Sequence, residues 1–179
     1  MNDIFENRIE VDGKTRVPVW FMRQAGRYHD HYQNLKKTNT FMEMCKQPAL
    51  ADEVTMGPIN EFDFDAAILF SDLLFPLEQL GLGLEYSPGP KLEKHLKTLQ
   101  DVDNLKLVSS ASDFYNFQGE ACKAIRKSLP DTKSLLGFVG APFTLFAYAV
   151  EGSHAGSLVS SKTGLYDGRF ERFCELLLP

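Results

Sequence analysis

Three short apolar runs in the sequence predict buried β-strands, at Val17–Met22, Ala66–Phe70 and Ser134–Val139. Apolar residues at helical spacing predict helices between and after these runs, notably over residues 110–129, 142–150 and 166–178. Strands that alternate with helices at this spacing are typical of a parallel α/β architecture. The periodicity leaves both a closed barrel and an open sheet possible.

The other segments are mostly polar. Residues 1–16 predict a loose N-terminal arm, and residues 91–109 carry only weakly spaced leucines. Glycine and serine are frequent in residues 152–164, which predicts a mobile loop. These segments therefore connect the predicted strands and helices.

The composition is that of an ordinary globular chain, with 179 residues, 44% hydrophobic and 24% charged. This length suits a single domain over residues 1–179. No apolar run reaches the eighteen residues of a membrane span, and the acidic start does not resemble a secretory signal. The three cysteines lie far apart in sequence, which favours reduced thiols in a cytoplasmic protein. A formal net charge of −5 argues against nucleic acid as a partner, but not against a small anion.

Two arginines follow the first predicted strand directly. Arg23 and Arg27 flank Gly26, which would let the backbone turn sharply. Guanidinium groups stay charged and bind carboxylates through a planar fork of donors, so the pair predicts an anion pocket. Two surface salt bridges are the alternative. Asp72 likewise follows the second predicted strand, either as a carboxylate in a cleft or as a helix N-cap.

Four segments, in this order and spacing, resemble the N-terminal half of the uroporphyrinogen decarboxylase family. They are Met-Arg-Gln-Ala-Gly-Arg-Tyr at residues 22–28, Ala-Ala-Ile-Leu-Phe-Ser-Asp at 66–72, Gly-Phe-Val-Gly-Ala-Pro-Phe-Thr-Leu at 137–145 and Tyr-Ala-Val-Glu-Gly at 148–152. The resemblance implies a (β/α)8 TIM barrel, of which this chain would supply about the first half. Catalytic groups in such barrels lie at the C-terminal ends of the strands.

The resemblance also implies an activity in haem and porphyrin biosynthesis. Family members remove the four acetate carboxyl groups of uroporphyrinogen III to give coproporphyrinogen III, without a cofactor. The implied catalytic residues are Asp72, which would face the pyrrole N–H groups, and Tyr148. Because an ionised carboxylate only accepts hydrogen bonds, Asp72 suits those donors and the cationic ring formed during reaction. Ordinary core packing is the alternative for Tyr148.

The implied substrate-binding residues form a larger set. Arg23 and Arg27 would bind the acetate and propionate carboxylates, and Lys36 would make a third, weaker contact. The set comprises Arg23, Gln24, Ala25, Gly26, Arg27, Lys36, Asp72 and Tyr148. Family members form homodimers, which implies the same for this chain.

Two further motifs carry less weight. His29 and His31 could suggest zinc, but no further ligands follow at metal spacing, so we expect a solvated loop and no metal site. They stand where the family usually has Leu-Pro. Gly81 and Gly83 lack the rest of a dinucleotide-binding fingerprint and predict a helix end and a turn.

The sequence leaves two alternatives to the decarboxylase. One is a cobalamin-dependent methyltransferase, which shares the barrel but lacks the Arg-Gln-Ala-Gly-Arg motif. The other is a non-catalytic fragment that only binds tetrapyrrole, because family members are about twice as long as this chain. A half-barrel would expose the edge of its last strand, and we expect it to self-associate.

Overall fold

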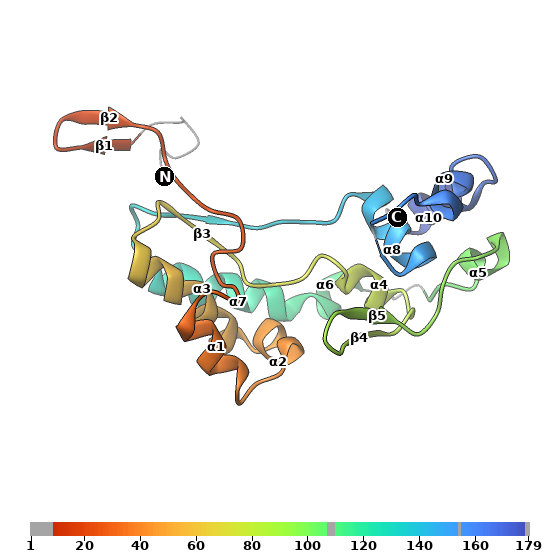
Figure 1. Ribbon diagram of the computed structural model, residues 1–179, viewed down its shortest axis with the longest axis horizontal. Coiled ribbons are helices and arrows are strands. Elements are labelled where there is room, and N and C mark those ends of the chain that lie inside the picture. Colours follow the sequence, from red (N-terminus) through yellow and green to blue (C-terminus); the bar gives the residue numbers. More distant parts are fainter. Residues whose placement is uncertain (1–8, 107–109, 154, 178–179) are drawn as a thin grey trace. The chain divides into compact units, whose positions relative to one another are not determined.

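The structure is a computed structural model that describes residues 9–106, 110–153 and 155–177. Its contacts divide the chain into two compact units, with the elements labelled in Figure 1. The first unit comprises Met1–Ser71 and Tyr115–Phe138, and the second comprises Asp72–Phe114 and Val139–Pro179. The expected single domain over residues 1–179 stays a prediction.

The first unit contains a pair of parallel strands. Strand β3 (Ala66–Ile68) lies beside β6 (Ser134–Leu136), with Ala66 opposite Ser134 and Ile68 opposite Leu136. Both strands fall within runs that the sequence predicted, although each is shorter than its run. Parallel strands need a long crossover connection, which here includes helices. The α/β part of the predicted fold class is therefore confirmed.

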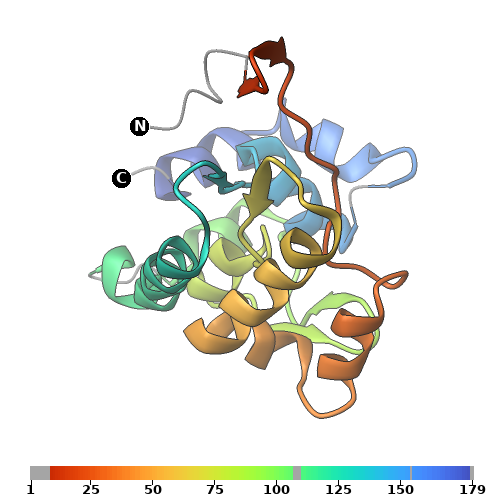
Figure 2. The same cartoon turned by 90° about the vertical axis from the view of Figure 1, so that its left-hand side faces the viewer.

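Four helices accompany this strand pair. Helices α3 (Pro48–Phe62) and α7 (Asn116–Ser128) pack against each other and against β3 and β6 respectively. Helices α1 (Asp30–Lys36) and α2 (Phe41–Lys46) pack on α3, and Figure 2 shows these helices in shades of orange. One hydrophobic core cluster of the unit comes from α3, β3 and α7 and their flanks: Ala51, Met56, Ile59, Ala67, Leu69, Ala121, Ile125 and Leu129.

The N-terminal segment is more ordered than the sequence indicates. Strands β1 (Ile9–Val11) and β2 (Lys14–Arg16) form an antiparallel hairpin, turned at Asp12 and Gly13, both with positive φ. The expectation of a loose arm is therefore wrong for residues 9–16. Residues 1–8 lie outside the described part of the chain.

The predicted strand at Val17–Met22 is wrong. The segment has no regular secondary structure, and its apolar side chains are exposed, with Val17 at 69% and Met22 at 77%. Only one hydrogen bond among the described residues joins its backbone to the backbone of the stretch before β3, from Asp65 N–H to Val19 C=O at 3.0 Å. The apolar composition suits a strand buried between two neighbours. Here the segment meets β3 mainly through side chains, so no ladder forms.

The second unit is mainly helical. Helix α8 (Pro142–Glu151) packs against α4 (Phe75–Gln79), α9 (Val159–Gly164) and α10 (Arg169–Leu177). Buried aromatic rings join these helices, with the Phe146 and Phe173 centroids 5.5 Å apart. Strands β4 (Leu84–Tyr86) and β5 (Pro90–Leu92) form an antiparallel hairpin, as the turn residues between them suggest.

Three sequence expectations on helices need correction. The single helix over residues 110–129 is two helices, α6 (Ala111–Phe114) and α7, separated at Tyr115. The polar stretch 91–109 contains α5 (Leu99–Asp103), which begins with a capping box between Thr98 and Asp101. The predicted loop 152–164 contains α9. Helix α5 rests on local capping and α9 on contacts with α8 and α10, which apolar periodicity does not reveal.

Candidate functional site

The site begins at Gln24, which ties the arginine segment to strand β3. Its side chain is 3% exposed. Its Nε2 donates to the Ala66 carbonyl at 2.7 Å, and its Oε1 accepts from the Ile68 N–H at 3.1 Å. The Leu69 N–H donates a hydrogen bond to the Leu136 carbonyl of β6 at 2.9 Å. Peptide groups of adjacent strand residues point to opposite edges of the strand, so the Ile68 N–H points away from β6. Gln24 therefore occupies the edge of β3 that β6 leaves open.

Asp65 holds the other end of the same segment. Its carboxylate accepts two bonds from the Arg16 guanidinium, both at 2.6 Å, and a third from the Val19 N–H at 2.7 Å. These hydrogen bonds, chiefly those from Arg16, hold the pKa of the Asp65 carboxyl below its usual value. The chain from Arg16 to Gln24 is thus fixed to the β3 edge at both ends.

The backbone bends through Gly26, as expected, and also adopts an unusual conformation at Arg23. Arg23 has φ +61°, in the left-handed region that residues with a Cβ rarely adopt. Gly26 is required for another reason, because a Cβ there would lie 3.2 Å from the Arg23 carbonyl oxygen and 3.3 Å from the Tyr28 ring. The small residue lets the loop close on itself.

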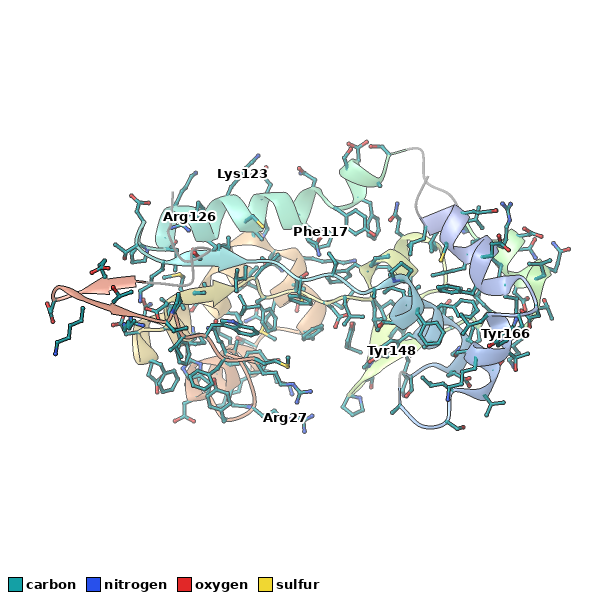
Figure 3. All side chains as sticks on the ribbon, turned by 90° about the horizontal axis from the view of Figure 1, so that it is seen from above. Arg27, Phe117, Lys123, Arg126, Tyr148 and Tyr166 are labelled. Carbon is teal, nitrogen blue, oxygen red and sulfur yellow. The ribbon has the colours of Figure 1, made fainter. Side chains whose placement is uncertain are left out.

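Both arginine side chains are exposed, and Figure 3 shows Arg27 projecting from its loop. Neither guanidinium has a hydrogen-bond or ion-pair partner among the described residues. The surface salt bridges offered as the alternative are therefore not formed within that part of the chain. Lys36, in the last turn of α1, is also exposed. The loop thus presents cationic groups to solvent on a buried base.

Tyr32 is a neighbour of this loop that the sequence analysis missed. Its ring lies 5.6 Å from the ring of Phe70, which follows β3. Burial raises the pKa of its hydroxyl, the nearby Cys45 raises it further, and Arg27 acts in the opposite direction. The electrostatic effect shows that Arg27 and Tyr32 are close. Tyr32 stands four residues after Tyr28 in the predicted polar segment, and this spacing was the available sign that the two tyrosines are neighbours.

His29 and His31 do not form the expected solvated loop. His29 is 2% exposed, and its Nε2 lies 2.7 Å from the Glu61 carboxylate. Its backbone N–H donates to the Gly26 carbonyl at 3.0 Å, which closes the arginine loop at the start of α1. No cluster of three or more metal-binding side chains occurs among the described residues. The histidine at the usual leucine position is therefore a packed residue with an ionic partner.

The second unit holds the other two candidates. Asp72 is half-buried, and its Oδ1 accepts a hydrogen bond from the Leu74 N–H at 2.7 Å, just before α4. Tyr148 lies on α8 (Figure 3), and burial, together with the negative charge of Asp72, raises the pKa of its hydroxyl. The two residues are thus close enough to interact electrostatically. The turn contact of Asp72 uses one oxygen, and the other forms no hydrogen bond within the described part of the chain.

Taken by unit, the sequence-predicted residues fall into two groups. Arg23, Gln24, Ala25, Gly26, Arg27 and Lys36 belong to the first unit, and Asp72 and Tyr148 belong to the second. Residues 23–27 form one loop, and Asp72 and Tyr148 interact electrostatically, whereas Lys36 lies apart in the last turn of α1. Their roles toward a substrate stay predictions.

Parallel strands flanked by helices, with an exposed cationic loop at the sheet edge, define an α/β protein. The family model described as Uroporphyrinogen decarboxylase (URO-D) matches residues 2–177. The chain therefore belongs to the uroporphyrinogen decarboxylase family. This result favours the decarboxylase interpretation over the methyltransferase alternative.

Curated relatives agree with the family match. The uroporphyrinogen decarboxylase of Citrifermentans bemidjiense is 45% identical over 150 residues, which cover 84% of this chain and 44% of the relative. That of Carboxydothermus hydrogenoformans is 38% identical over 179 residues, which cover 99% of this chain and 51% of the relative. The chain thus spans about half the length of the curated relatives it matches. Among the described residues, no helix is long and apolar enough to cross a membrane.

Proposed function

We propose that the protein to which this chain belongs is a uroporphyrinogen decarboxylase acting in porphyrin biosynthesis. The observation that carries the proposal is the arginine loop. Two exposed guanidinium groups without partners among the described residues stand on a buried and fully bonded base, within the motif shared with the family. A substrate with eight carboxylates supplies the partners that these groups lack.

Arg23 and Arg27 bind and orient acetate and propionate carboxylates in this proposal, and Lys36 adds a weaker contact. Guanidinium is a poor acid at neutral pH, so the arginines act first by binding. Ala25 and Gly26 contribute by keeping the loop small enough to approach the substrate. A side chain at the Gly26 position would meet the Arg23 carbonyl oxygen and the Tyr28 ring in tight contacts of 3.2 Å and 3.3 Å.

Asp72 accepts hydrogen bonds from the pyrrole N–H groups in the proposed reaction. Protonation of the ring carbon beside an acetate arm makes the ring cationic, and the carboxylate leaves as CO2 with its bonding electrons returning to the ring. A second proton completes the methyl group, and the ring proton is released. The pyrrole is the electron sink, so the step needs no cofactor, and the carboxylate stabilises the cation.

Tyr148 is proposed to act beside Asp72. Its hydroxyl stays protonated at neutral pH because burial and the Asp72 charge both raise its pKa. A protonated hydroxyl donates a hydrogen bond to Asp72 or to a substrate carboxylate. This role fits a half-buried tyrosine that faces a charged neighbour.

We further propose that both units belong to one (β/α)8 barrel, and that the protein acts as a cytoplasmic homodimer. The parallel β3–β6 pair and the helices after each strand support the barrel. The location of Asp72 shortly after β3 supports a site at the C-terminal ends of the strands.

The test is a decarboxylation assay on the intact protein, with its mass measured on the same sample. Uroporphyrinogen III is supplied under anaerobic conditions, and products are separated by carboxyl number after oxidation. We expect products with seven to four carboxyl groups to accumulate in turn. Binding of the substrate without loss of CO2 would support the non-catalytic alternative instead.

A further inference from the structure

The buried amide of Gln24 connects strand β3 to Arg23, the next residue along the chain. We propose that Gln24 is a positioning residue, whose side chain takes the place of a strand peptide group and thereby fixes Arg23 for carboxylate binding. The inference rests on the proposed function, because it assigns the means by which the proposed arginine site is held.

The geometry at the sheet edge specifies an amide. The Ala66 carbonyl requires a donor, and the Ile68 N–H requires an acceptor. A residue of a parallel neighbouring strand would supply both from its own backbone. The Gln24 side chain supplies both from one planar group, at 2.7 Å and 3.1 Å. Leucine supplies neither, and an ionised glutamate supplies only the acceptor.

The backbone of Gln24 is held as well. Its carbonyl accepts a hydrogen bond from the Tyr28 hydroxyl, across the turn that contains Gly26. The Gly26 carbonyl in turn accepts from the His29 N–H. The residue is therefore fixed through its side chain on β3 and through its main chain in the loop.

Arg23 needs such support because of its conformation. Its φ of +61° is unfavourable for a residue with a Cβ and persists only where the surroundings impose it. Its side chain makes no hydrogen bond or ion pair with the described residues, so none of them holds it there through the guanidinium. Gln24 is the adjacent buried residue that can impose it. A binding group held in advance loses less freedom when the ligand arrives.

The first test uses ligand-free protein, in which a direct contact of Gln24 with substrate plays no part. Gln24→Leu should speed hydrogen exchange of the Ile68 amide by about tenfold or more, since one hydrogen bond is lost. Gln24→Glu keeps the acceptor for the Ile68 N–H at neutral pH but loses the donor to the Ala66 carbonyl, so exchange at Ile68 should be faster than in the wild type and slower than in Gln24→Leu. At acid pH the protonated glutamic acid again donates to Ala66 and accepts from Ile68, so protection should return. Unchanged exchange at Ile68 in both variants would overturn the proposal.

The second test is a double-mutant cycle measured as the dissociation constant for uroporphyrinogen III in the intact protein. Gln24→Leu should weaken binding about tenfold when Arg23 is present, because Arg23 is then no longer held in its binding conformation. In the Arg23→Ala background the same change should have little further effect. Ile125→Val is the matched control, a buried, uncharged change in the core of the same unit. It should lower stability without coupling to Arg23.

The outcomes separate the two proposals. If Arg23→Ala alone leaves binding unchanged, the arginine site of the proposed function fails. If Arg23→Ala weakens binding but Gln24→Leu weakens it equally in both backgrounds, Gln24 does not act through Arg23 and the positioning role is wrong. Strong coupling together with the loss of Ile68 protection supports the positioning role.

Discussion

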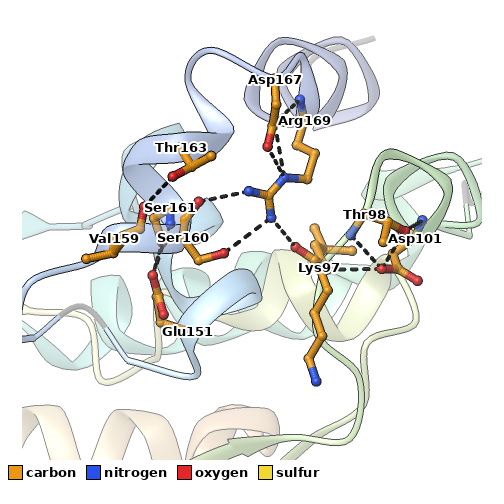
Figure 4. Close-up of polar contacts among 11 residues, drawn as sticks. Lys97, Thr98, Asp101, Glu151, Val159, Ser160, Ser161, Thr163, Asp167 and Arg169 are labelled. Carbon is orange, nitrogen blue, oxygen red and sulfur yellow. Dashed lines mark hydrogen bonds and ion pairs between the residues drawn. The ribbon is translucent and has the colours of Figure 1, made fainter.

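Arginine side chains have opposite environments in the arginine loop of the first unit (residues 23–27) and at Arg169 of the second unit. Arg169 is 4% exposed, and Figure 4 shows its guanidinium surrounded by partners. It donates to the Asp167 carboxylate at 2.9 Å and to the carbonyls of Leu96 and Ser160, each at 2.9 Å. Arg23 and Arg27 are exposed and have no such partners among the described residues.

The difference separates an arginine that stabilises the fold from the two arginines that we propose to bind a ligand. Arg169 joins α10 to the segment before α5 and to α9, so its charge is neutralised inside the unit. In the arginine loop the buried and bonded residue is Gln24, while the charges next to it remain available. Burying the support and exposing the cation keeps a guanidinium ready for a carboxylate.

The largest expected effect tests the chemistry that the exposed loop is proposed to serve. Asp72→Asn should lower turnover of uroporphyrinogen about 10²–10³-fold, since a charge that stabilises the cationic ring is lost. Folding should change little, because the asparagine oxygen can still accept from the Leu74 N–H. Steady-state kinetics and urea unfolding on one sample measure both quantities. Asp113→Asn, an exposed carboxylate of the same unit, is the control. An active Asp72→Asn enzyme would leave Asp72 with only its turn contact.

The next effect concerns the contribution of the buried Arg169 to stability. Arg169→Met should lower the free energy of unfolding by about 3 kcal/mol, because buried carbonyls and Asp167 lose a charged donor. Arg172→Met is the matched control, since Arg172 is 42% exposed and pairs with Asp103 and Glu175 at the surface. Its loss should be much smaller. Similar losses in the two variants would remove the distinction between buried and exposed arginines.

Replacement of the exposed arginines should weaken substrate binding and leave stability unchanged. Arg23→Ala and Arg27→Ala should each weaken uroporphyrinogen binding by roughly 1–3 kcal/mol, through loss of charged hydrogen bonds, with the unfolding free energy unchanged. Lysine at either position should restore only part of the affinity, because the fork of donors is lost. Titration calorimetry under anaerobic conditions measures the binding. A large loss of stability in these variants would place them with Arg169.

The smallest effect concerns Asp65, which holds the start of the arginine segment. Because its pKa is lower in the folded state, its contribution to stability is present above the ordinary aspartate pKa of about 3.9. That contribution is lost as the pH falls through the depressed folded value. Thermal unfolding of the wild type and Asp65→Asn between neutral and acid pH measures it. The two curves should converge at acid pH; a constant gap would show that the charge of Asp65 contributes nothing.

Local signals in the sequence predicted much of the helical structure. Pro48 and Pro142 mark the starts of α3 and α8, and Gly81 marks the end of α4, because these residues act through the backbone itself. The runs at β3 and β6 were equally clear. The Val17–Met22 run misled because its apolar side chains are exposed here, and apolar composition alone does not state what covers a segment.

The candidate site was predictable in its residues but not in its construction. The motif identified Arg23, Gln24 and Arg27 together, yet nothing in it distinguishes the exposed cations from the buried amide. That distinction depends on Ala66 and Ile68, more than forty positions away along the chain. His29 shows the same limit, since its burial depends on Glu61 of α3.

The salt dependence of tetrapyrrole binding shows whether Arg23 and Arg27 bind the carboxylates of the substrate. The measurement compares the intact protein carrying Asp72→Asn, which is expected to slow turnover, with the same protein also carrying Arg23→Ala and Arg27→Ala. If the exposed arginines bind carboxylates, added salt should weaken uroporphyrinogen binding, and the slope of log Kd against log salt should be clearly smaller without the two arginines. Equal affinities and equal slopes in the two proteins would show that these arginines do not bind the substrate carboxylates.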